Sequence, residues 1–303
     1  MVFDVGGTEI KYSVMDEQMH RTNSGAVPTP QDTQAQFLDT VYRLYAPHKD
    51  EVTGIAMALP GFVDNRTGYV SNGGALLYNT ATPVGQLLAE KCGCPVILEN
   101  DGKAAAMAEL ANGALKGCCN AAVFIIGTGV GGGIIANGQL VRGVHFTAGE
   151  YSFVNTNAEA WDAPDQNMAC QCSTRNLLIW YRARKALPED APLDGRSFFA
   201  AANAGEPEAL EVLRRFCHAV AVQIFNLTVL LDVEKVAIGG GISKQPLLLE
   251  SLRSAYDGLF ASRAGQAYME GLPRCQIVPC AFSSEANQVG VAAAYFEAMQ
   301  KKC

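Results

Sequence analysis

The sequence predicts an α/β fold made of two lobes. Short apolar runs typical of strands alternate along the 303 residues with segments whose apolar residues have helical spacing. A pattern of strand, glycine turn and strand occurs twice, around Gly6-Gly7-Thr8 and around Gly127-Thr128-Gly129. Two related halves that each present a glycine turn indicate two lobes with a cleft between them.

In the first half, the runs at 1–5 and 10–15 flank the first glycine turn and predict a β-hairpin. Apolar residues recur at helical spacing over 33–46, with Thr33 as the expected N-cap. The run GIAMAL at 54–59 is continuously apolar and ends at a proline-glycine pair, which predicts a buried strand. Further on we expect the end of a helix at 87–91, a short strand at 95–98 and an alanine-rich helix at 102–114.

In the second half, a strand at 121–126 enters the second glycine turn and another strand follows at 134–135. The stretch 154–175 is polar and irregular. Apolar residues spaced along one face predict a long helix over 206–231 whose buried side holds Leu210, Leu213, Phe216, Val220, Ile224, Leu227 and Leu231. A strand at 236–238 and a helix at 284–299 follow. We expect an N-terminal lobe at 1–114, a C-terminal lobe at 115–283 and a C-terminal helix at 284–303 that packs back on the first lobe.

Charge and composition exclude several classes of protein. The formal net charge is −7, from 23 Lys and Arg against 30 Asp and Glu, and basic residues form no cluster longer than a doublet, so nucleic acid is a poor partner. No apolar run reaches the 18 to 20 residues that span a bilayer, and the N-terminus lacks the features of a signal peptide. We therefore expect a cytoplasmic protein whose ten cysteines are reduced thiols.

The first glycine turn has the residue types of a phosphate site. Gly6 and Gly7 let the backbone approach a bulky anion, and Thr8 adds a hydroxyl donor. Asp4, at the end of the entering strand, suits a divalent cation that keeps part of its water shell, as Mg²⁺ does. An ordinary hairpin turn beside a surface aspartate explains the segment equally well.

The second turn is richer in glycine, with five in the seven residues 127–133. Because each glycine costs conformational entropy, close approach of the backbone to phosphate is the more economical explanation. The segment is neither a Walker A loop nor a dinucleotide-binding fingerprint. Gly239-Gly240-Gly241 after a strand is a third place where a ligand could approach, and a tight strand-to-helix turn explains it about as well.

Asp101 stands where an apolar strand gives way to the alanine-rich helix. In α/β proteins the carboxyl ends of strands face the usual ligand crevice. There a carboxylate can accept the proton of an alcohol that receives a phosphoryl group, and Asn100 beside it could bind a hydroxyl. On local grounds alone, Asp101 as the N-cap of the next helix is the more common arrangement.

The order of these motifs resembles that of ROK-family sugar kinases over essentially the whole chain. The matching segments are DVGGTEIK at 4–11, PGFVDNRTG at 60–68, ENDGKAAAMAE at 99–109, GTGVGGGII at 127–135, AGE at 148–150 and GGGIS at 239–243. The resemblance implies a two-lobed actin/hexokinase-like ATPase fold with duplicated ribonuclease-H-like domains. It also implies ATP and Mg²⁺, phosphorylation of a sugar hydroxyl, and a homodimer.

The resemblance also assigns roles to residues. Asp101 becomes the general base, and Asp4 lies near Mg²⁺, through water. The residues implied at the sugar are Asn100, Glu150 and Gly61. The residues implied at the nucleotide are Asp4, Gly6, Gly7, Thr8, Lys11, Gly127, Thr128, Gly129, Gly240 and Gly241. ROK repressors carry an N-terminal DNA-binding module, whereas this chain begins at the phosphate hairpin and keeps Asp101, which favours a kinase.

The chain departs from the family pattern at two places. Phe153 stands where most members carry a sugar-site histidine. Cys170 and Cys172 remain from the usual zinc motif, but two thiolates cannot complete a four-coordinate zinc site, so no structural zinc is expected. The positions of the missing glycine, cysteine and glutamate hold Asn176, Leu177 and Ile179.

These departures resemble the zinc-free branch of β-glucoside kinases, together with GGALLYNT at 73–80, VRGVHFTAGEYSFV at 141–154 and MACQCSTRNLL at 168–178. Enzymes of that branch phosphorylate the 6-hydroxyl of the non-reducing glucose of cellobiose and similar glycosides. The alternatives are a glucokinase or another hexose kinase of the family, and a non-catalytic sugar-sensing member. An unrelated actin-like ATPase with a protein partner fits the motifs less well.

Overall fold

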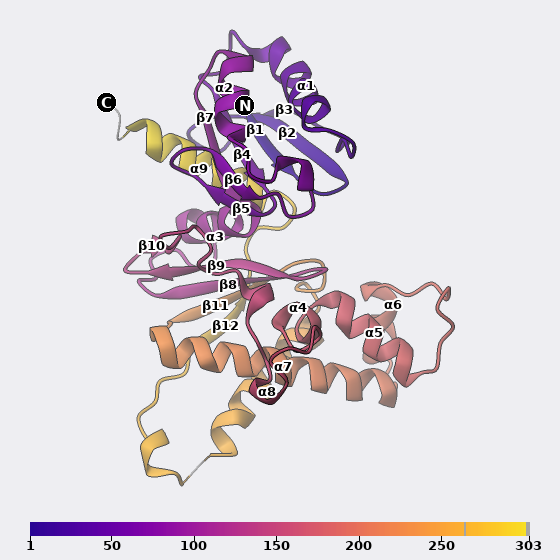
Figure 1. Ribbon diagram of the computed structural model, residues 1–303. Helices are drawn as coiled ribbons and strands as arrows, with labels where there is room; N and C mark the ends of the chain where they lie inside the picture. The colour runs from indigo at the N-terminus through magenta and orange to yellow at the C-terminus, as the bar shows by residue number, and fades with distance from the viewer. Residues whose placement is uncertain (264, 301–303) are drawn as a thin grey trace. The chain divides into compact units, whose positions relative to one another are not determined.

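A computed structural model describes residues 1–263 and 265–300 (Figure 1). The chain divides into two compact units. Unit 1 holds residues 1–113, 140–148 and the C-terminal segment from Ser284, and unit 2 holds residues 114–139 and 149–283. Each unit has helices packed on a five-stranded mixed sheet, which confirms the predicted α/β class.

The sheet of unit 1 has the strand order β3-β2-β1-β4-β7. Its strands are β1 (Val2–Val5), β2 (Glu9–Met15), β3 (Arg21–Pro28), β4 (Ile55–Leu59) and β7 (Val96–Asn100). The predicted hairpin is confirmed, since β1 and β2 pair antiparallel and Val5 lies opposite Ile10. The predicted buried strand is confirmed too, because every residue of β4 is buried between its parallel neighbours β1 and β7.

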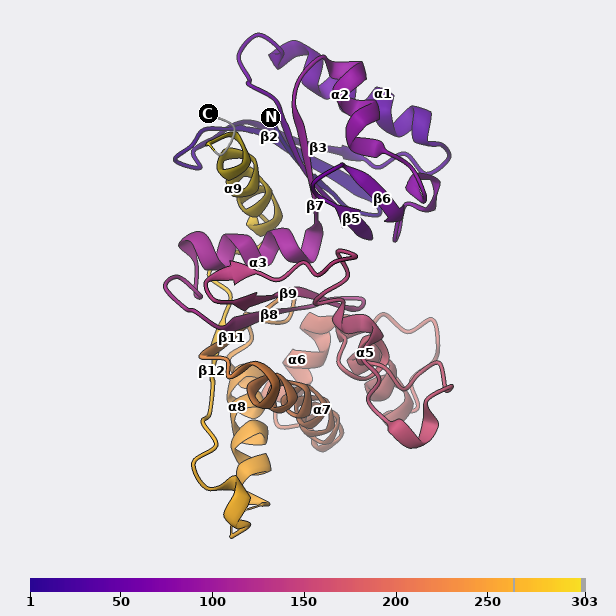
Figure 2. The same cartoon turned by 60° about the vertical axis from the view of Figure 1, so that its left-hand side comes forward.

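Helices cover both faces of this sheet (Figure 2). They are α1 (Gln34–Tyr45), α2 (Val84–Cys92), α3 (Asp101–Asn112) and α9 (Ala286–Gln300). The Thr33 side chain caps α1 by accepting a hydrogen bond from the Gln36 amide, as predicted. Helix α9 crosses α3 so closely that a Cβ on Gly290 would lie 1.7 Å from the Ala104 carbonyl oxygen. The end of the predicted C-terminal segment, 301–303, lies outside the described residues.

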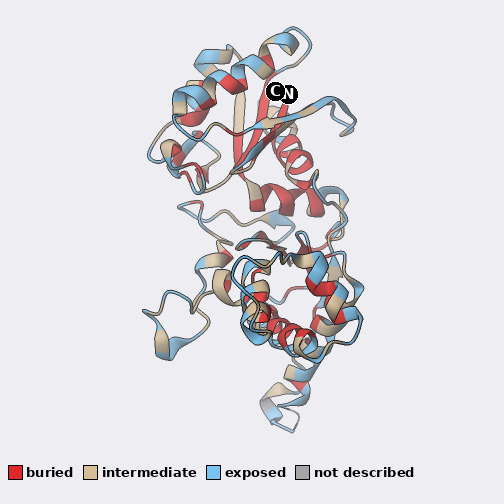
Figure 3. Cartoon of the chain, turned by 90° about the vertical axis from the view of Figure 1, so that its right-hand side faces the viewer, coloured by how far each residue is buried: buried red, intermediate tan, exposed pale blue. Residues whose placement is uncertain are grey.

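Two short strands and two 3₁₀ helices complete unit 1. Strands β5 (Phe62–Asp64) and β6 (Tyr69–Asn72) form a two-stranded sheet. Two 3₁₀ helices occur at Ala46–His48 and Leu77–Asn79. The buried residues lie mostly on strands β1, β2, β4 and β7 and on the inward faces of the helices, whereas β3 has none (Figure 3).

The sheet of unit 2 has the order β10-β9-β8-β11-β12. Its strands are β8 (Ala121–Ile126), β9 (Val130–Ala136), β10 (Gln139–Leu140), β11 (Lys235–Gly239) and β12 (Gln276–Pro279). Strands β8 and β9 form the second predicted hairpin. The helices are α4 (Met168–Gln171), α5 (Thr174–Arg184), α6 (Gly195–Asn203), α7 (Pro207–Leu231) and α8 (Pro246–Ala261), with 3₁₀ helices at Tyr151–Phe153, Ala158–Ala160 and Ala267–Met269.

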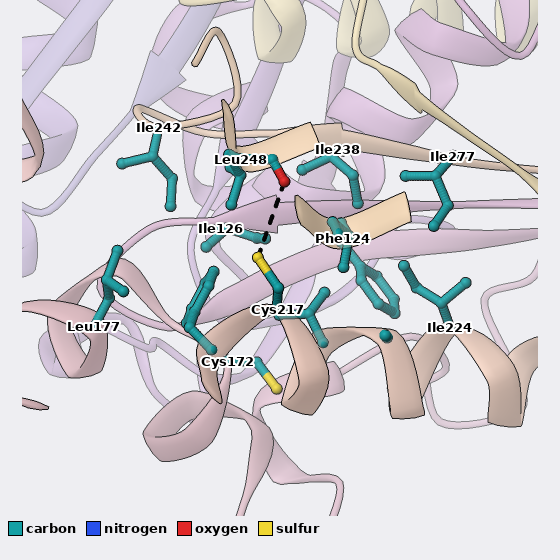
Figure 4. Packing of buried hydrophobic residues seen from close by; sticks show 14 of the residues in the cluster. Phe124, Ile126, Cys172, Leu177, Cys217, Ile224, Ile238, Ile242, Leu248 and Ile277 are labelled. Carbon is teal, nitrogen blue, oxygen red and sulfur yellow. Dashed lines mark hydrogen bonds between the residues drawn. The ribbon is translucent and has the colours of Figure 1, made fainter. Parts of the chain in front are cut away.

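Helix α7 supplies much of the core of unit 2. Figure 4 shows Cys217 and Ile224 of this helix facing Phe124, Ile126 and Ile238 of the sheet. The predicted helix is confirmed, but its buried face is rotated slightly from the predicted one. Leu210 is 39% exposed and Leu227 and Leu231 are only partly buried, because the core-facing positions near the helix ends are taken by other residues: Ala209 and Val212 near the start and Thr228 near the end. Within residues 1–263 and 265–300, no helix has the length and apolar character needed to cross a membrane.

Candidate active site

Asp4 is held at the base of the first hairpin by strand alternation. Its neighbours Phe3 and Val5 enter the core of unit 1, so the carboxylate faces the opposite side of the sheet, where α9 lies. There Asn287 Nδ2 donates a hydrogen bond of 2.9 Å to Asp4 Oδ1. Burial raises the pKa of Asp4, and the Asn287 hydrogen bond and the charge of Lys11 partly offset that rise. A half-buried carboxylate with these partners fits a magnesium ion approached through water.

The first glycine turn is braced through its carbonyl groups. The Gly6 amide donates to the Glu9 carbonyl oxygen at 2.9 Å, and the Thr29 hydroxyl donates to the Gly6 carbonyl oxygen at 2.8 Å. Gln31 Nε2 donates to the Gly7 carbonyl oxygen at 2.7 Å. Within the described part of the chain, the structure gives the amides of Gly7 and Thr8 no acceptor. The turn therefore presents two adjacent N–H groups, the arrangement that cradles an anion.

The second turn is shorter than the glycine content suggests. Only 127–129 connect the strands, with the Gly127 amide donating to the Gly129 carbonyl oxygen at 3.0 Å. The Thr174 amide donates to the Gly127 carbonyl oxygen at 2.9 Å, and the Val130 amide donates to Ser152 Oγ at 3.0 Å. The sequence pattern does not point to Ser152 or Thr174, since each lies more than 20 residues from the turn that it braces.

The last three glycines of the run lie in β9, so phosphate does not explain all five. Gly132 has φ 140°, and a Cβ there would lie 1.8 Å from the Val123 carbonyl oxygen of β8. The ring of Tyr151 covers the same place, and its hydroxyl donates to the Gly133 carbonyl oxygen at 3.1 Å. Close packing inside unit 2 is therefore the reason for Gly132, which corrects the prediction that the whole glycine run serves phosphate.

The two glycines that follow β11, Gly240 and Gly241, also differ in what surrounds them. Gly240 has φ 98°, and a Cβ there would lie 2.1 Å from the Ile126 carbonyl oxygen. The Ser243 hydroxyl donates to the Gly240 carbonyl oxygen at 2.8 Å and closes the turn that leads to α8. Gly241 borders open space, with no described atom within 4 Å of the place where a Cβ would lie. Packing explains Gly240, and Gly241 leaves room for a ligand.

Strand β7 ends at Asn100, and Asp101 is the first residue of α3. Asn100, not Asp101, is the N-cap, because Asn100 Oδ1 accepts a hydrogen bond of 3.0 Å from the Lys103 amide. Asp101 Oδ1 accepts from the Gly102 amide at 2.7 Å. The capping role considered for Asp101 thus belongs to its neighbour. Asp101 stands in the first turn, where the helix dipole favours a negative charge.

Asn100 also contacts the proline-glycine loop. Its Nδ2 donates to the Gly61 carbonyl oxygen at 2.9 Å, so two of the predicted sugar residues are in direct contact. Gly61 has φ 94°, and a Cβ there would lie 2.0 Å from the Asn72 carbonyl oxygen. The side-chain amide of Asn100 therefore already has two structural partners. A sugar hydroxyl would have to use the second N–H or the second lone pair of that side chain.

Glu99 is a functional candidate that the sequence pattern does not reveal. Its side chain is fully buried, yet it carries a carboxylate beside the predicted catalytic pair. Arg142 Nε lies 2.8 Å from Glu99 Oε2, and Asn65 Nδ2 lies 3.4 Å from the same atom. The sequence offers one signal for Glu99, a charged residue at the end of an apolar strand. It gives no sign of the partner Arg142, which is 43 residues away in the sequence.

Two further residues of unit 2 that the sequence singles out, Glu150 and Phe153, lie at the two ends of a short 3₁₀ helix. Glu150 immediately precedes Tyr151–Phe153, and Tyr151 is buried against Phe124 with ring centroids 4.6 Å apart. Phe153, two residues further, is 71% exposed. The residue in the position of the family's histidine is thus an apolar side chain open to its surroundings.

The remnants of the zinc motif have other roles in this structure. Cys172 is buried in the core of unit 2, and burial raises its pKa to about 12. Leu177, in the place of the third cysteine, is fully buried in the same core. Among residues 1–263 and 265–300, no group of three histidine, cysteine, aspartate or glutamate side chains is arranged to hold a metal ion.

Comparison with known proteins agrees with the motif order. The ROK family model matches residues 1–300. A β-glucoside kinase of Klebsiella pneumoniae is 30% identical over 255 residues, which is 83% of this chain and 84% of the relative. A solved ROK family protein of Streptococcus pneumoniae TIGR4 in complex with sucrose has a TM-score of 0.86 at 27% identity and covers 99% of both chains.

A ROK family glucokinase of Streptomyces griseus, solved in complex with glucose and AMPPNP, has a TM-score of 0.78 at 26% identity and covers 96% of this chain and 97% of its own. These likenesses confirm the predicted actin/hexokinase-like fold and the predicted class, carbohydrate kinase. The two kinases differ in the sugar that their names give, a β-glucoside in one and glucose in the other. The chain belongs to the ROK family.

Proposed function

We propose that the protein is an ATP-dependent sugar kinase in which Asp101 is the general base. The observation that carries the proposal is the corner between β7 and α3. There a carboxylate occupies the first turn of a helix whose cap, Asn100, is fixed to the Gly61 loop. A base at such a corner is rigidly placed, which is what proton abstraction from a bound hydroxyl requires.

The proposed reaction transfers the γ-phosphoryl group from ATP to a sugar hydroxyl. Asp101 accepts the hydroxyl proton as the sugar oxygen bonds to phosphorus, and the bond between that phosphorus and the β,γ-bridging oxygen breaks to release ADP. Because charge moves onto the transferring group and the leaving oxygen, fixed N–H groups and a cation stabilise the transition state. Asp101 remains responsible for the proton alone.

The glycine turns suit the nucleotide. The acceptor-free amides of Gly7 and Thr8 support a phosphate role for the first turn. In unit 2, Thr128 is exposed at the tip of the second turn and Gly241 borders open space, which suits contacts to a nucleotide. The AMPPNP bound by the Streptomyces griseus glucokinase supports ATP as the phosphoryl donor.

Asp4 is the residue proposed to hold Mg²⁺, through water. The ion would supply positive charge near the phosphates of the nucleotide. One Asp4 oxygen accepts the hydrogen bond from Asn287, which fixes the carboxylate for that task. Lys11, opposite Asp4 across the hairpin, would add a second positive charge.

For the acceptor we propose a β-glucoside such as cellobiose, phosphorylated at the 6-hydroxyl. The name of the Klebsiella pneumoniae relative supports it, and so does the exposed ring of Phe153, which would favour an apolar or glycosidic substituent over a free hydroxyl. Glucokinase activity is the second candidate, favoured by the Streptomyces griseus likeness. A non-catalytic sugar sensor is the third.

A coupled ADP-release assay tests the three. Purified protein with MgATP is given glucose, methyl β-glucoside and cellobiose, and kcat/KM is compared. The proposal expects cellobiose and methyl β-glucoside to exceed glucose. A clear preference for free glucose would replace the β-glucoside assignment by glucokinase, and no sugar-dependent ADP release from any sugar would favour the sensor. The homodimer implied by the family resemblance stays a prediction, which analytical ultracentrifugation of the same sample checks.

A further inference from the structure

Segment 140–148 groups with unit 1, although the residues before and after it in the sequence belong to unit 2. The segment ends directly before Gly149 and Glu150, and the family resemblance implies Glu150 at the sugar. What holds this segment on unit 1 therefore fixes the start of the chain that leads to Glu150. Two arginine contacts hold it.

The first contact joins Arg142 to Glu99. Glu99 is fully buried at the end of β7, and burial raises its pKa, while the guanidinium of Arg142, the Asn100 amide and Lys103 oppose that rise. An unpaired carboxylate in such surroundings is strongly unfavourable, so Glu99 requires a cationic partner. Arg142 provides one through its Nε at 2.8 Å.

The guanidinium reaches both sides of the corner that carries Asp101. Its Nε contacts Glu99 in the strand before the corner, and its Nη2 lies 3.3 Å from Met107 Sδ in the helix after it. Only the fork of an arginine makes both contacts, since a lysine ammonium can occupy one of the two places. Arg142 therefore fastens its segment to β7 and α3 together.

The second contact joins Phe146 to Arg66. The Arg66 guanidinium carbon lies 4.7 Å from the centre of the Phe146 ring, and Phe146 is 8% exposed. Phe146 has φ 60°, a left-handed conformation that is unfavourable for a bulky residue. The segment closes on itself through the Ala148 amide, which donates to the Arg142 carbonyl oxygen at 3.2 Å. A backbone conformation of this kind persists only where surrounding contacts hold it, and the contacts of Arg142 and Phe146 do so here.

We infer that Arg142, through its ion pair with Glu99, is a positioning residue that fixes segment 140–148 and thereby sets the affinity for the sugar. The inference rests on the proposed kinase function. Arg142 acts through the segment and takes no part in proton transfer. Its loss therefore weakens sugar binding and leaves nucleotide binding in place.

The test compares Arg142→Gln with Arg184→Gln in the full-length protein. Arg184 is a matched control, because its Nε lies 2.8 Å from Glu211 Oε2 in an ion pair on the surface of unit 2. For Arg142→Gln the KM for the best sugar should rise about tenfold or more, as expected when a binding group is misplaced. The KM for ATP should stay within about twofold, and Arg184→Gln should change neither constant beyond about twofold.

Hydrogen exchange provides a readout that does not depend on turnover. In Arg142→Gln the peptide covering 142–148 should exchange faster than in the wild type, and in Arg184→Gln it should not. The double variant Glu99→Gln with Arg142→Gln should melt at a higher temperature than Arg142→Gln alone, since it no longer buries an unpaired carboxylate. Arg142→Lys should restore the melting temperature but only part of the sugar affinity.

The wild type separates failure of this inference from failure of the proposed function. If the wild type phosphorylates no sugar, the kinase proposal fails. If the wild type turns over and Arg142→Gln lowers the melting temperature but leaves the sugar KM and the exchange of 142–148 unchanged, Arg142 is merely a stabilising residue and the inference is wrong.

Discussion

The side chain of Asn100 donates a hydrogen bond of 2.9 Å to the Gly61 carbonyl oxygen while its own oxygen caps α3. One residue thus joins the proline-glycine loop to the helix on which Asp101 stands. The first bond fixes the Gly61 loop and the second fixes the first turn of α3. Asp101, the proposed base, is the residue that directly follows Asn100 in that turn. The arrangement leads to a first prediction about stability and catalysis together.

Asn100→Ala should lose both bonds. Loss of a helix cap, which leaves the Lys103 amide without its acceptor, costs about 1 kcal/mol of unfolding free energy, and loss of the bond to the Gly61 carbonyl oxygen adds to it. Because Asp101 also loses its fixed neighbour, kcat should fall at the same time. Thr33→Ala is the control, since it removes the cap of α1 in the same unit. Urea unfolding and steady-state kinetics of both variants check this, and equal kcat in the two would contradict it.

Asp4→Asn should stabilise the protein at neutral pH and impair catalysis. Burial raises the pKa of Asp4 above 3.8, so the folded state holds this proton more tightly than the unfolded state does. Ionised Asp4 therefore opposes folding, and the opposition grows as pH rises from 3.8 through the raised pKa. Asparagine is neutral and keeps an oxygen for the hydrogen bond from Asn287.

Thermal melts from pH 3 to pH 8 measure this effect, with the pH range chosen to bracket the carboxyl titration. The melting temperature of Asp4→Asn should exceed that of the wild type at pH 7, and the difference should shrink toward pH 3. A lower melting temperature for Asp4→Asn than for the wild type at pH 7 would mean that ionised Asp4 stabilises the folded state, which contradicts the prediction. Unchanged kcat at saturating Mg²⁺ would remove Asp4 from the metal site.

Gly132 and Gly241 should respond differently to alanine. At Gly132 the added methyl meets the Val123 carbonyl oxygen, so Gly132→Ala should lower the unfolding free energy by more than about 2 kcal/mol. At Gly241 the methyl enters open space, so the unfolding free energy should change by less than about 0.5 kcal/mol, while the KM for ATP rises. Unfolding curves and ATP titrations check both. An unchanged unfolding free energy in Gly132→Ala would contradict the packing role of Gly132. An unchanged KM for ATP in Gly241→Ala would contradict the ligand role of Gly241.

Chelation should leave the fold intact. Cys172 is buried with a pKa raised to about 12, and Leu177 fills the position of a family zinc ligand, so the thiol remains protonated inside the core. We expect the melting temperature in 1,10-phenanthroline to equal that in buffer. Release of one zinc ion per chain on denaturation, measured with a colorimetric indicator, would show that a metal site exists after all.

The elements with strong patterns can be predicted from the sequence. Continuous apolar runs such as β4 and the cap at Thr33 identify their elements directly. Strand β3 carries no such pattern, because it is an edge strand with mostly exposed residues, and the sequence does not predict it. The prediction for the glycine run is too broad because sequence alone does not separate a glycine that meets a ligand from Gly132, which meets a neighbouring strand.

The candidate site can be predicted where its residues are adjacent in the sequence. Asn100 and Asp101 stand out, but the predicted cap lies one residue too far along, since either side chain can cap a helix and only the backbone decides. The ion pair between Glu99 and Arg142 is not visible in the sequence, because it depends on a chain path that brings 140–148 back to unit 1.

The most direct test of the whole account is the kinetics of Asp101→Asn. Asparagine keeps the size and the hydrogen-bonding position of the side chain but cannot accept the proton. We predict that kcat falls by at least about 100-fold, while the sugar dissociation constant, measured by calorimetry, stays within about threefold of the wild type. A variant that turns over at nearly the wild-type rate would contradict the assignment of Asp101 as the base.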